Sequence, residues 1–379
     1  MIKVLIIFGT RPEAIKLAPV INKLNADKRF KTIICSTGQH REMLKPVLDI
    51  FKIRLDYDLD LMKKNQDLFD ISSYSLLKLK GVLRKIKPSI LIVQGDTTTA
   101  FISALAAYYT KVQIAHVEAG LRSFNVFSPY PEEANRRFIS VITDMHFAPT
   151  PDSEKNLLAE GISRKKVFVT GNTVIDALLE IKTNLVNPKK DISIRKELLN
   201  HLPPELFNGK YILITMHRRE KFGKEFEIVL KAIREIAWRY KELNFVYPVH
   251  LNPNVQIPVK KLLKNQKNIF LIPPQSYFNF IYLMSKCHFL LSDSGGVQEE
   301  CYVFRKPIIV LRDVTERNEA IRAGYAFLAG SNPKKIKQYF DGICESLEKK
   351  HNFFKVRNPF GDGKASDRIV KILAKKFDT

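Results

Sequence analysis

The sequence predicts an α/β protein built from two doubly wound, Rossmann-like domains. From the first residues onward, short apolar runs alternate with longer amphipathic stretches of helical period. The alternation stops at a polar stretch, residues 191–204, which carries Pro203 and Pro204, and then starts again. Such alternation is typical of parallel sheets with helices on both faces, and the interruption indicates two units.

Short runs rich in apolar side chains predict the strands, and stretches with a 3.6-residue apolar period predict the helices. In the first half we expect strands at residues 4–8, 32–36, 90–94, 113–117, 145–147 and 167–170, and helices at 14–24, 68–85, 99–109 and 132–141. In the second half we expect strands at 211–215, 244–248, 269–271, 288–292 and 308–311, and helices at 226–240 and 366–377. The domains are expected at 1–170 and 171–359, joined between Gly171 and Gly209.

The composition is that of a soluble globular protein, with 45% hydrophobic and 27% charged residues among 379. No apolar run approaches the roughly 20 residues that cross a bilayer, and residues 4–8 lack the flanks of a signal peptide. We therefore expect a cytoplasmic protein without a membrane partner. The cysteines are far apart, which favours buried free thiols over a zinc site or disulfides. They are Cys35, Cys287, Cys301 and Cys344.

The chain is strongly basic, since 62 lysines and arginines against 39 acidic residues give a net charge of +23. This balance attracts anions, which include nucleic acids, acidic lipids and phosphorylated small molecules. A lysine-rich solvated surface explains the same number without any ligand. No helix-turn-helix, RNP or zinc-finger pattern is present, so we expect no nucleic-acid partner.

The strand-to-helix junctions are where a ligand is expected, because open parallel sheets bind ligands beyond the carboxyl ends of their strands. Arg11 and Lys16 follow the first strand, after a Gly-Thr turn, with Pro12 suited to the first helical position. Two cations beside a helix start suit an anion. The spacing is not a dinucleotide fingerprint, so NAD is not indicated.

Three carboxylates follow neighbouring strands of the same domain. Asp96 comes after the strand at 90–94, Glu118 after the strand at 113–117, and Glu132 opens a helix. Two of them have a structural alternative: Asp96, or a threonine after it, as a helix cap, and Glu132 as a favourable charge at a helix N-terminus. Glu118, after a buried apolar run, has less structural explanation. Their combination on one edge of a sheet, opposite cations, favours acid–base chemistry.

The second domain carries its own candidate anion site. Ser294, Gly295 and Gly296 form a turn between a strand and a helix, where free N–H groups suit phosphate oxygens. Glu300, one helical turn on, suits ribose hydroxyls, and a ligand-free Ser-capped helix is the alternative. His217 ends another strand beside two arginines, which favours pyrophosphate contact or proton transfer over a packed core histidine. Residues 275–280 are weak candidates to frame a base.

These motifs resemble the non-hydrolysing UDP-N-acetylglucosamine 2-epimerases. The resemblance runs in order along nearly the whole chain, through residues 9–16, 95–99, 116–122, 131–136, 171–173, 217–220, 293–300 and 358–363. It implies the two-domain GT-B fold with the ligand in an interdomain cleft, and a C-terminal helix, about 360–379, that packs back on the first domain. It also implies a homodimer, and a product used in surface polysaccharide biosynthesis.

The resemblance implies an isomerase that inverts C2 of UDP-N-acetylglucosamine without any cofactor or metal. UDP leaves C1 as a base removes the C2 proton, and protonation of the resulting 2-acetamidoglucal from the other face precedes return of UDP. The implied catalytic residues are Asp96, Glu118, Glu132, His217 and Lys16. The implied binding residues for UDP-N-acetylglucosamine and UDP are Arg11, Arg136, Gln275, Phe280, Ser294, Gly295, Gly296, Glu300 and Arg317.

Two departures from the family pattern and two rival activities remain open. Asn318 stands where the family usually has proline, and Arg305 where it usually has glycine, which puts the positioning of the nucleotide-side loop in doubt. Residues 39–42 resemble a regulatory substrate contact, or an ordinary helix start. The rival activities are a hydrolysing epimerase that releases N-acetylmannosamine, and a GT-B glycosyltransferase.

Overall fold

The structure is a computed structural model that describes residues 1–38, 41–61, 66–185, 187–208, 211–218 and 222–377. The chain divides into two compact units. The first unit comprises Met1–Ala177 together with Phe360–Thr379, and the second comprises Leu178–Pro359. The division between them falls inside helix α7 (Thr173–Leu185).

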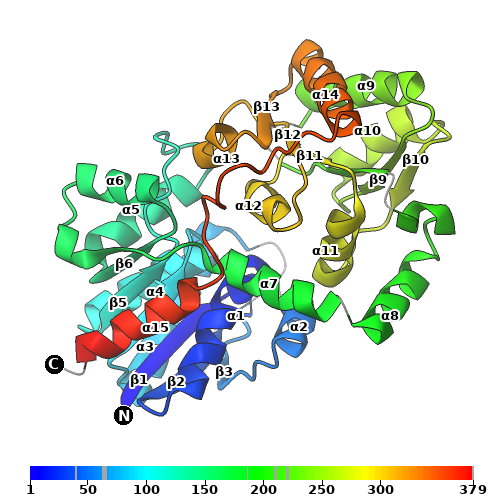
Figure 1. The fold of residues 1–379 in the computed structure, drawn as a ribbon. Coiled ribbons are helices and arrows are strands. Elements are labelled where there is room, and N and C mark those ends of the chain that lie inside the picture. The colour runs from blue at the N-terminus through cyan, green and yellow to red at the C-terminus, as the bar shows by residue number, and fades with distance from the viewer. Residues whose placement is uncertain (39–40, 62–65, 186, 209–210, 219–221, 378–379) are drawn as a thin grey trace. The chain divides into compact units, whose positions relative to one another are not determined.

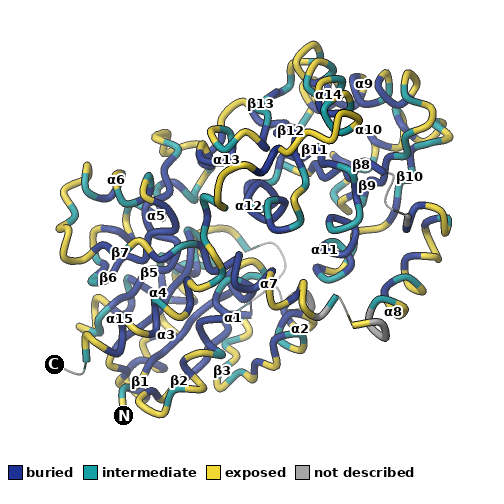
Figure 2. The backbone as a smooth tube through the Cα atoms, in the orientation of Figure 1, coloured by how far each residue is buried: buried dark blue, intermediate teal, exposed yellow. Residues whose placement is uncertain are grey.

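The first unit contains a seven-stranded parallel sheet in the order β3-β2-β1-β4-β5-β6-β7. Its strands are β1 (Ile2–Phe8), β2 (Phe30–Ser36), β3 (Tyr57–Asp58), β4 (Ile90–Gln94), β5 (Gln113–Val117), β6 (Met145–Ala148) and β7 (Val167–Val169). The central strands are continuous runs of buried apolar residues, as expected for a sheet covered on both faces (Figure 2). The strand order reverses between β1 and β4, which makes this the switch point of the sheet.

Helices surround this sheet (Figure 1). They are α1 (Arg11–Ala26), α2 (Arg41–Ile50), α3 (Leu68–Ile86), α4 (Thr98–Tyr109), α5 (Glu132–Ile142), α6 (Pro151–Ala159) and α15 (Ala365–Phe377), with a 3₁₀ turn at Arg164–Lys166. α3, α4 and α5 pack side by side, and α15 packs along α1 although the two helices come from opposite ends of the chain.

The second unit repeats the same architecture with six parallel strands, in the order β10-β9-β8-β11-β12-β13. Its strands are β8 (Tyr211–Thr215), β9 (Asn244–Pro248), β10 (Ile269–Ile272), β11 (Leu290–Ser292), β12 (Ile308–Val310) and β13 (Ala326–Leu328). Its helices are α8 (Pro188–Leu198), α9 (Lys224–Arg239), α10 (Pro253–Leu263), α11 (Tyr277–Lys286), α12 (Gly295–Val303), α13 (Asn318–Arg322) and α14 (Pro333–Glu348), with a 3₁₀ turn at Pro204–Asn208. The switch point lies between β8 and β11.

The predicted α/β class with two doubly wound sheets is confirmed. Two short edge strands, β3 and β13, were not predicted, because runs of two and three residues carry no periodicity. The polar stretch at 191–204 includes most of α8, whose surface is largely solvated. Among the described residues, no helix is long and apolar enough to cross a membrane.

A buried carboxylate of α7 holds the start of α15. Asp176 accepts hydrogen bonds from the backbone N–H groups of Ala365 (3.2 Å) and Ser366 (2.8 Å) and from the Ser366 hydroxyl (2.6 Å). The first N–H groups of a helix have no partner within the helix, so a side chain distant in sequence supplies the acceptor here. This contact attaches the last helix to the first unit.

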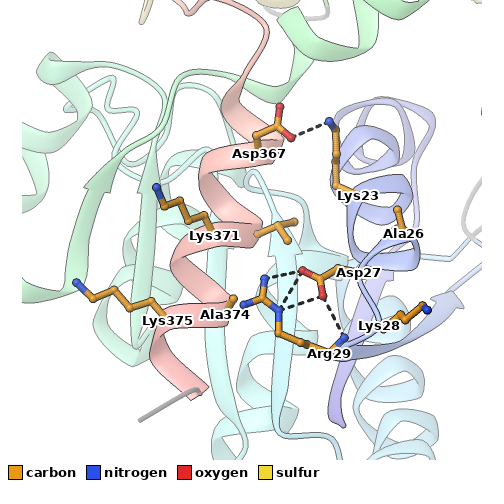
Figure 3. A pocket seen from close by; sticks show the side chains of 10 residues that line it. Lys23, Ala26, Asp27, Lys28, Arg29, Asp367, Lys371, Ala374 and Lys375 are labelled. Carbon is orange, nitrogen blue, oxygen red and sulfur yellow. Dashed lines mark hydrogen bonds and ion pairs between the residues drawn. The ribbon is translucent and has the colours of Figure 1, made fainter.

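α15 makes a second contact, with α1, that is exposed to solvent (Figure 3). Lys23 and Asp367 form an ion pair of 2.7 Å, with both side chains 50% exposed. Beside it lies an open groove of about 840 Å³, lined by the end of α1 and one face of α15. The groove lies near the start of β2, at the opposite edge of the sheet from the carboxyl ends of the strands.

We expect these two contacts to differ in their effect on stability. Asp176→Ala leaves three buried donors without an acceptor, which should lower the free energy for opening α15 by about 2–4 kcal/mol. Asp367→Ala breaks an exposed pair and should cost at most about 1 kcal/mol. Native-state hydrogen exchange of the α15 amides measures both, since two-unit proteins rarely unfold in one step. Equal effects would contradict the assignment of α15 docking to Asp176.

Candidate active site

The predicted acid–base residues of the first unit all lie at the carboxyl edge of its sheet. Arg11 is the first residue of α1, directly after the β1 turn, and Lys16 lies on the same helix. Asp96 follows β4, Glu118 follows β5, and Glu132 is the first residue of α5. Parallel strands end at one edge, so the topology places these residues along the same edge of the sheet, where Lys16 pairs with Glu118.

Glu118 is buried and paired. It forms a salt bridge with Lys16 and accepts a hydrogen bond from the Asn172 side chain at 3.0 Å, and its side chain is 5% exposed. Its φ of +65° lies in the left-handed region, which a non-glycine residue occupies at a cost of the order of 1–2 kcal/mol. A buried, strained acid at a strand end indicates that the position needs the carboxylate.

Asp96 is held by α5. Its carboxylate pairs with Arg136, and its backbone carbonyl accepts from the Asn135 side chain at 2.9 Å. Arg136 in turn contacts Glu133 at 3.1 Å. Of the aspartate and threonine that could cap the next helix, Thr97 is the cap, because it accepts the hydrogen bond from the N–H of Ala100 at 3.0 Å, and Asp96 is not.

Glu133 is the fully buried neighbour of the predicted Glu132. It accepts from the backbone N–H of Ser123 (2.9 Å), from Arg136 (3.1 Å) and from Arg137 (3.1 Å). It therefore fixes the preceding loop and the arginine that holds Asp96. Glu132 itself is only partly buried at the start of α5, where the helix dipole stabilises a negative charge.

His116 supports the same edge as a neutral side chain. Burial lowers its pKa to about 3, and its Nε2 contacts the carbonyl of Gly95 at 2.7 Å. That carbonyl accepts, so Nε2 carries the proton. The residue before Asp96 is thus fixed by a histidine that stays uncharged at physiological pH.

In the second unit His217 lies at the carboxyl end of β8. The buried Asp293 accepts from the backbone N–H groups of His217 and Arg218, both at 2.9 Å, and lies 3.8 Å from the His217 imidazole. The imidazole is 45% exposed and stacks on His250 at 5.6 Å. Asp293 orients the loop while the ring stays accessible. Asp293 follows β11, so this contact spans the switch point of the second sheet.

The start of α12 lies against Arg317. A Cβ on Gly295 would lie 3.1 Å from the Arg317 guanidinium, so a larger residue would press on that side chain. The guanidinium is held by Glu299 (2.8 Å) and Glu316 (3.3 Å). The two flanking arginines lower the pKa of the Glu316 carboxyl against the effect of its burial. The predicted cation therefore lies beside the predicted phosphate turn.

The remaining predicted residues of this unit surround α11 and α12. Gln275 precedes α11 and donates to the carbonyl of Pro273 at 2.8 Å. Phe280 is half-buried on α11, and Glu300 accepts from the Tyr277 hydroxyl at 3.4 Å. Ser294 precedes α12, and its N–H donates to the Ser292 hydroxyl at 3.0 Å. Gly296 is the second residue of that helix.

Sequence reasoning did not single out the residues that hold the candidate side chains. These residues are Glu13, Thr97, His116, Glu133, Asn135, Asn172, Asp293 and Glu299. All of them sit in motifs noted for other members, and their partners lie up to 84 positions away. Arg219, Glu220, Gln39 and His40 lie outside the described residues, as do the side chains of Arg41 and Glu42.

The two departures from the family pattern have local explanations. Arg305 follows α12 with a φ of +55°, the conformation that a glycine adopts without strain. Asn318 is the first residue of α13, a position that favours proline. Both residues keep the backbone form that the usual residue favours. The two substitutions therefore do not change the backbone conformation that is expected at these two positions of the nucleotide-side loop.

Comparison with known proteins agrees with this architecture. The structure has two parallel sheets, each with candidate site residues at the point where its strand order reverses. This is the GT-B architecture of an α/β enzyme. The family model for UDP-N-acetylglucosamine 2-epimerase matches residues 22–374, and the chain belongs to this family. The expected resemblance is confirmed.

Individual relatives cover almost the whole chain. The UDP-N-acetylglucosamine 2-epimerase of Campylobacter jejuni is 47% identical over 98% of this chain and 97% of its own length. The crystal structure of the Neisseria meningitidis enzyme bound to UDP-GlcNAc has a TM-score of 0.93 at 48% identity, covering 99% of this chain and 100% of that one. The Methanocaldococcus jannaschii enzyme, in complex with UDP-GlcNAc and UDP, has a TM-score of 0.83 at 35% identity, covering 99% and 100%.

Proposed function

We propose that this chain interconverts UDP-N-acetylglucosamine and UDP-N-acetylmannosamine without hydrolysing them. The observation that carries the proposal is the pair of carboxylates, Asp96 and Glu118, each bound by its own cation at one sheet edge. Family membership supports the substrate. The C2 hydrogen of the sugar is not next to a carbonyl, so inversion by elimination and re-addition requires groups that remove and return protons.

The first unit supplies the proton transfers in this proposal. Arg136 pairs with Asp96 and Lys16 pairs with Glu118, which fixes the position of both carboxylates for proton transfer. A base removes the C2 proton while the C1–O bond to UDP breaks, which yields 2-acetamidoglucal. A second carboxyl group then acts as an acid and donates a proton to the opposite face of C2, and UDP adds to C1. Glu132 is the third carboxylate of this group. The reaction is redox-neutral, and we propose that it needs neither cofactor nor metal.

The second unit supplies the contacts to UDP in this proposal. Gly295, Gly296 and the preceding Ser294 offer N–H groups at a helix start, with Arg317 as the adjacent cation. His217 is accessible for the diphosphate and for its departure or return. Glu300 is proposed for the ribose, and Gln275 and Phe280 for the base. Arg11, at the start of α1, is proposed as a further binding residue for the sugar nucleotide.

The proposed chemistry predicts that solvent deuterium enters C2. Incubation with UDP-N-acetylglucosamine in D₂O should give both sugar nucleotides deuterated at C2, because the base exchanges with water between the two half-reactions. Proton NMR of the sugar measures this. Retention of the original hydrogen would contradict elimination, free N-acetylmannosamine with UDP would indicate the hydrolysing epimerase, and sugar transfer to an added acceptor would indicate a glycosyltransferase.

The proposed proton carriers predict a specific effect of amide substitution. Asp96→Asn, Glu118→Gln and Glu132→Gln keep the side-chain shape but remove the basic group. Each should lower kcat by about a hundredfold or more, the usual contribution of a positioned acid or base, with far-UV circular dichroism unchanged. A variant that lacks only the second donor should release some glycal.

Asp56→Asn is a suitable control for these variants. Its carboxylate accepts the N–H of Ile34 at 2.8 Å beside the edge strand β3, away from the strands β4 and β5 that carry the candidate carboxylates. This variant should change stability and leave kcat within a few-fold of the parent. Three amide variants that remain as active as the control would overturn the assignment of these carboxylates.

We further propose that the chain forms a homodimer through α3, α4 and α5. These adjacent helices of the first unit expose large apolar side chains that a monomer has no need to expose. They are Phe69 (84% exposed), Leu77 (69%), Tyr109 (64%), Phe138 (53%) and Val141 (78%). Two copies of the chain could bury these side chains against each other in a contact with two-fold symmetry, in which both copies use the same surface.

A charge placed on this face should separate the protomers. Leu77→Glu combined with Val141→Glu buries two carboxylates in the proposed contact, which should convert the dimer to a monomer in sedimentation equilibrium. Ile257→Glu, which replaces a 66% exposed side chain on the second unit, is the matched control and should leave the mass unchanged. A parent that sediments as a monomer would contradict the proposal.

We also propose a cytoplasmic location. Cys35, Cys287 and Cys301 are buried free thiols, and Cys344 is a partly buried one. Burial raises the pKa of the Cys35 and Cys287 thiols to about 12. Unpaired thiols of this kind are usual in a reducing compartment.

A further inference from the structure

Glu13 is a completely buried carboxylate in the first turn of α1, with a relative exposure of 1%. One of its oxygens, Oε2, accepts from the backbone N–H groups of Gly9 (3.1 Å) and Thr10 (2.8 Å) and from the Thr10 hydroxyl (2.7 Å). The other oxygen, Oε1, accepts from the Thr97 hydroxyl at 2.8 Å. Burial raises the pKa of this carboxyl, and all four contacts oppose that rise because each partner donates to the ionised form.

The direction of the Thr97 hydrogen bond follows from its second contact. The Thr97 oxygen already accepts the N–H of Ala100 at 3.0 Å as the cap of α4. A hydroxyl has one hydrogen, and Glu13 is the acceptor in reach. Thr97 therefore donates to Glu13, and both functions of this hydroxyl are fixed.

The two loop segments that Glu13 joins follow two different strands. Gly9 and Thr10 precede Arg11 at the end of β1, and Thr97 follows Asp96 at the end of β4. β1 and β4 are neighbours in the sheet, and the strand order reverses between them. At such a switch point the two connections lead away from each other, so the crevice between them has no backbone pairing to set its width.

A capping box accounts for only part of this arrangement. Thr10 as the cap and Glu13 three residues later form a capping box, which stabilises α1 on its own. That motif explains the contacts to Thr10 but not the contact to Thr97. The contact to Thr97 joins the loop of Arg11 to the loop of Asp96, across a sequence separation of 84.

We propose that Glu13 is a positioning residue that sets the distance between the Arg11 loop and the Asp96 loop through its hydrogen bond with Thr97. The inference rests on the proposed epimerase function for its kinetic effect. Glu13 has no contact with the reacting atoms in this role. It acts through Asp96, whose proton transfer requires placement within a fraction of an ångström, and a misplacement of about 1 Å can cost a hundredfold in rate.

A reversal of hydrogen-bond polarity tests the contact. Thr97→Asp keeps the cap of α4, because aspartate caps at least as well as threonine, but removes the donor and faces Glu13 with a second acceptor. Glu13→Gln keeps the capping box, which accepts glutamine. In the double variant the amide introduced by Glu13→Gln donates to the carboxylate introduced by Thr97→Asp, so the link is restored with the opposite direction.

The expected kinetic result is a loss and a rescue. Thr97→Asp should lower kcat for UDP-N-acetylglucosamine by about tenfold to a hundredfold with little change in KM, and the double variant should return to within about threefold of the parent. Thr97→Ser, which keeps both hydrogen bonds, should match the parent. Asp144→Asn replaces the charged acceptor of the Ile114 N–H at the opposite edge of the sheet with an amide, whose oxygen still accepts, and should leave kcat unchanged. Full activity in Thr97→Asp, or no rescue in the double variant, would overturn the inference.

Hydrogen exchange separates this inference from the proposed function. The amides of residues 9–11 and 95–97 should exchange at least tenfold faster in Thr97→Asp and return to the parent rate in the double variant. An inactive parent would overturn the proposed function, and the exchange rates would still decide whether Glu13 couples the loops. Unchanged exchange in both segments would overturn the coupling itself.

Discussion

The burial of carboxylates at the carboxyl edge of the first sheet is the constraint on which the site depends. An isolated buried charge costs several kcal/mol unless a cation or several donors compensate it. The buried Glu118 is compensated by Lys16 and Asn172, and the partly buried Asp96 by Arg136. The same contacts that make burial tolerable also fix where each oxygen points. Preorganisation in this unit is therefore a consequence of charge compensation.

In the second unit backbone N–H groups compensate a buried carboxylate. Asp293 is buried and accepts the N–H groups of residues 217 and 218, so a carboxylate shapes a loop whose own side chain, His217, stays accessible. Glu299 and Glu316 hold the Arg317 guanidinium against Gly295. At His217 the exposed group is the one suited to a ligand, while the buried Asp293 behind it provides the geometry. An exposed charged residue without such support would sample many conformers.

The sequence predicted the fold class, most strands and the candidate residues, because each of these leaves a local signal. Apolar runs reveal β4, β5, β8 and β9 to the residue, and acids that follow buried strands stand out from a solvated surface. The supporting contacts leave no such signal. Glu13 meets Thr97, and Glu118 meets Asn172, only after the sheet has formed, and the distance in sequence carries no information about that contact. The cap of α4 shows the limit well, since the sequence allows either an aspartate or a threonine to provide it, and only the structure shows that it is Thr97.

Arg305 and Glu118 both have a left-handed backbone conformation, and the structural reason for this strain differs between them. At Arg305 the turn after α12 requires the conformation, and the N–H groups of residues 305 and 306 close it onto Tyr302 (2.9 Å) and Cys301 (3.0 Å). A glycine would adopt it without strain, and the arginine compensates through Asn352 at 3.1 Å and the Phe354 ring. At Glu118 a glycine would relieve the strain equally, but it would also remove the partner of Lys16 and Asn172 and leave their polar groups buried without it. The strain at Arg305 is thus a local adjustment of a turn. At Glu118 it is retained because the carboxylate has to stand at the end of β5.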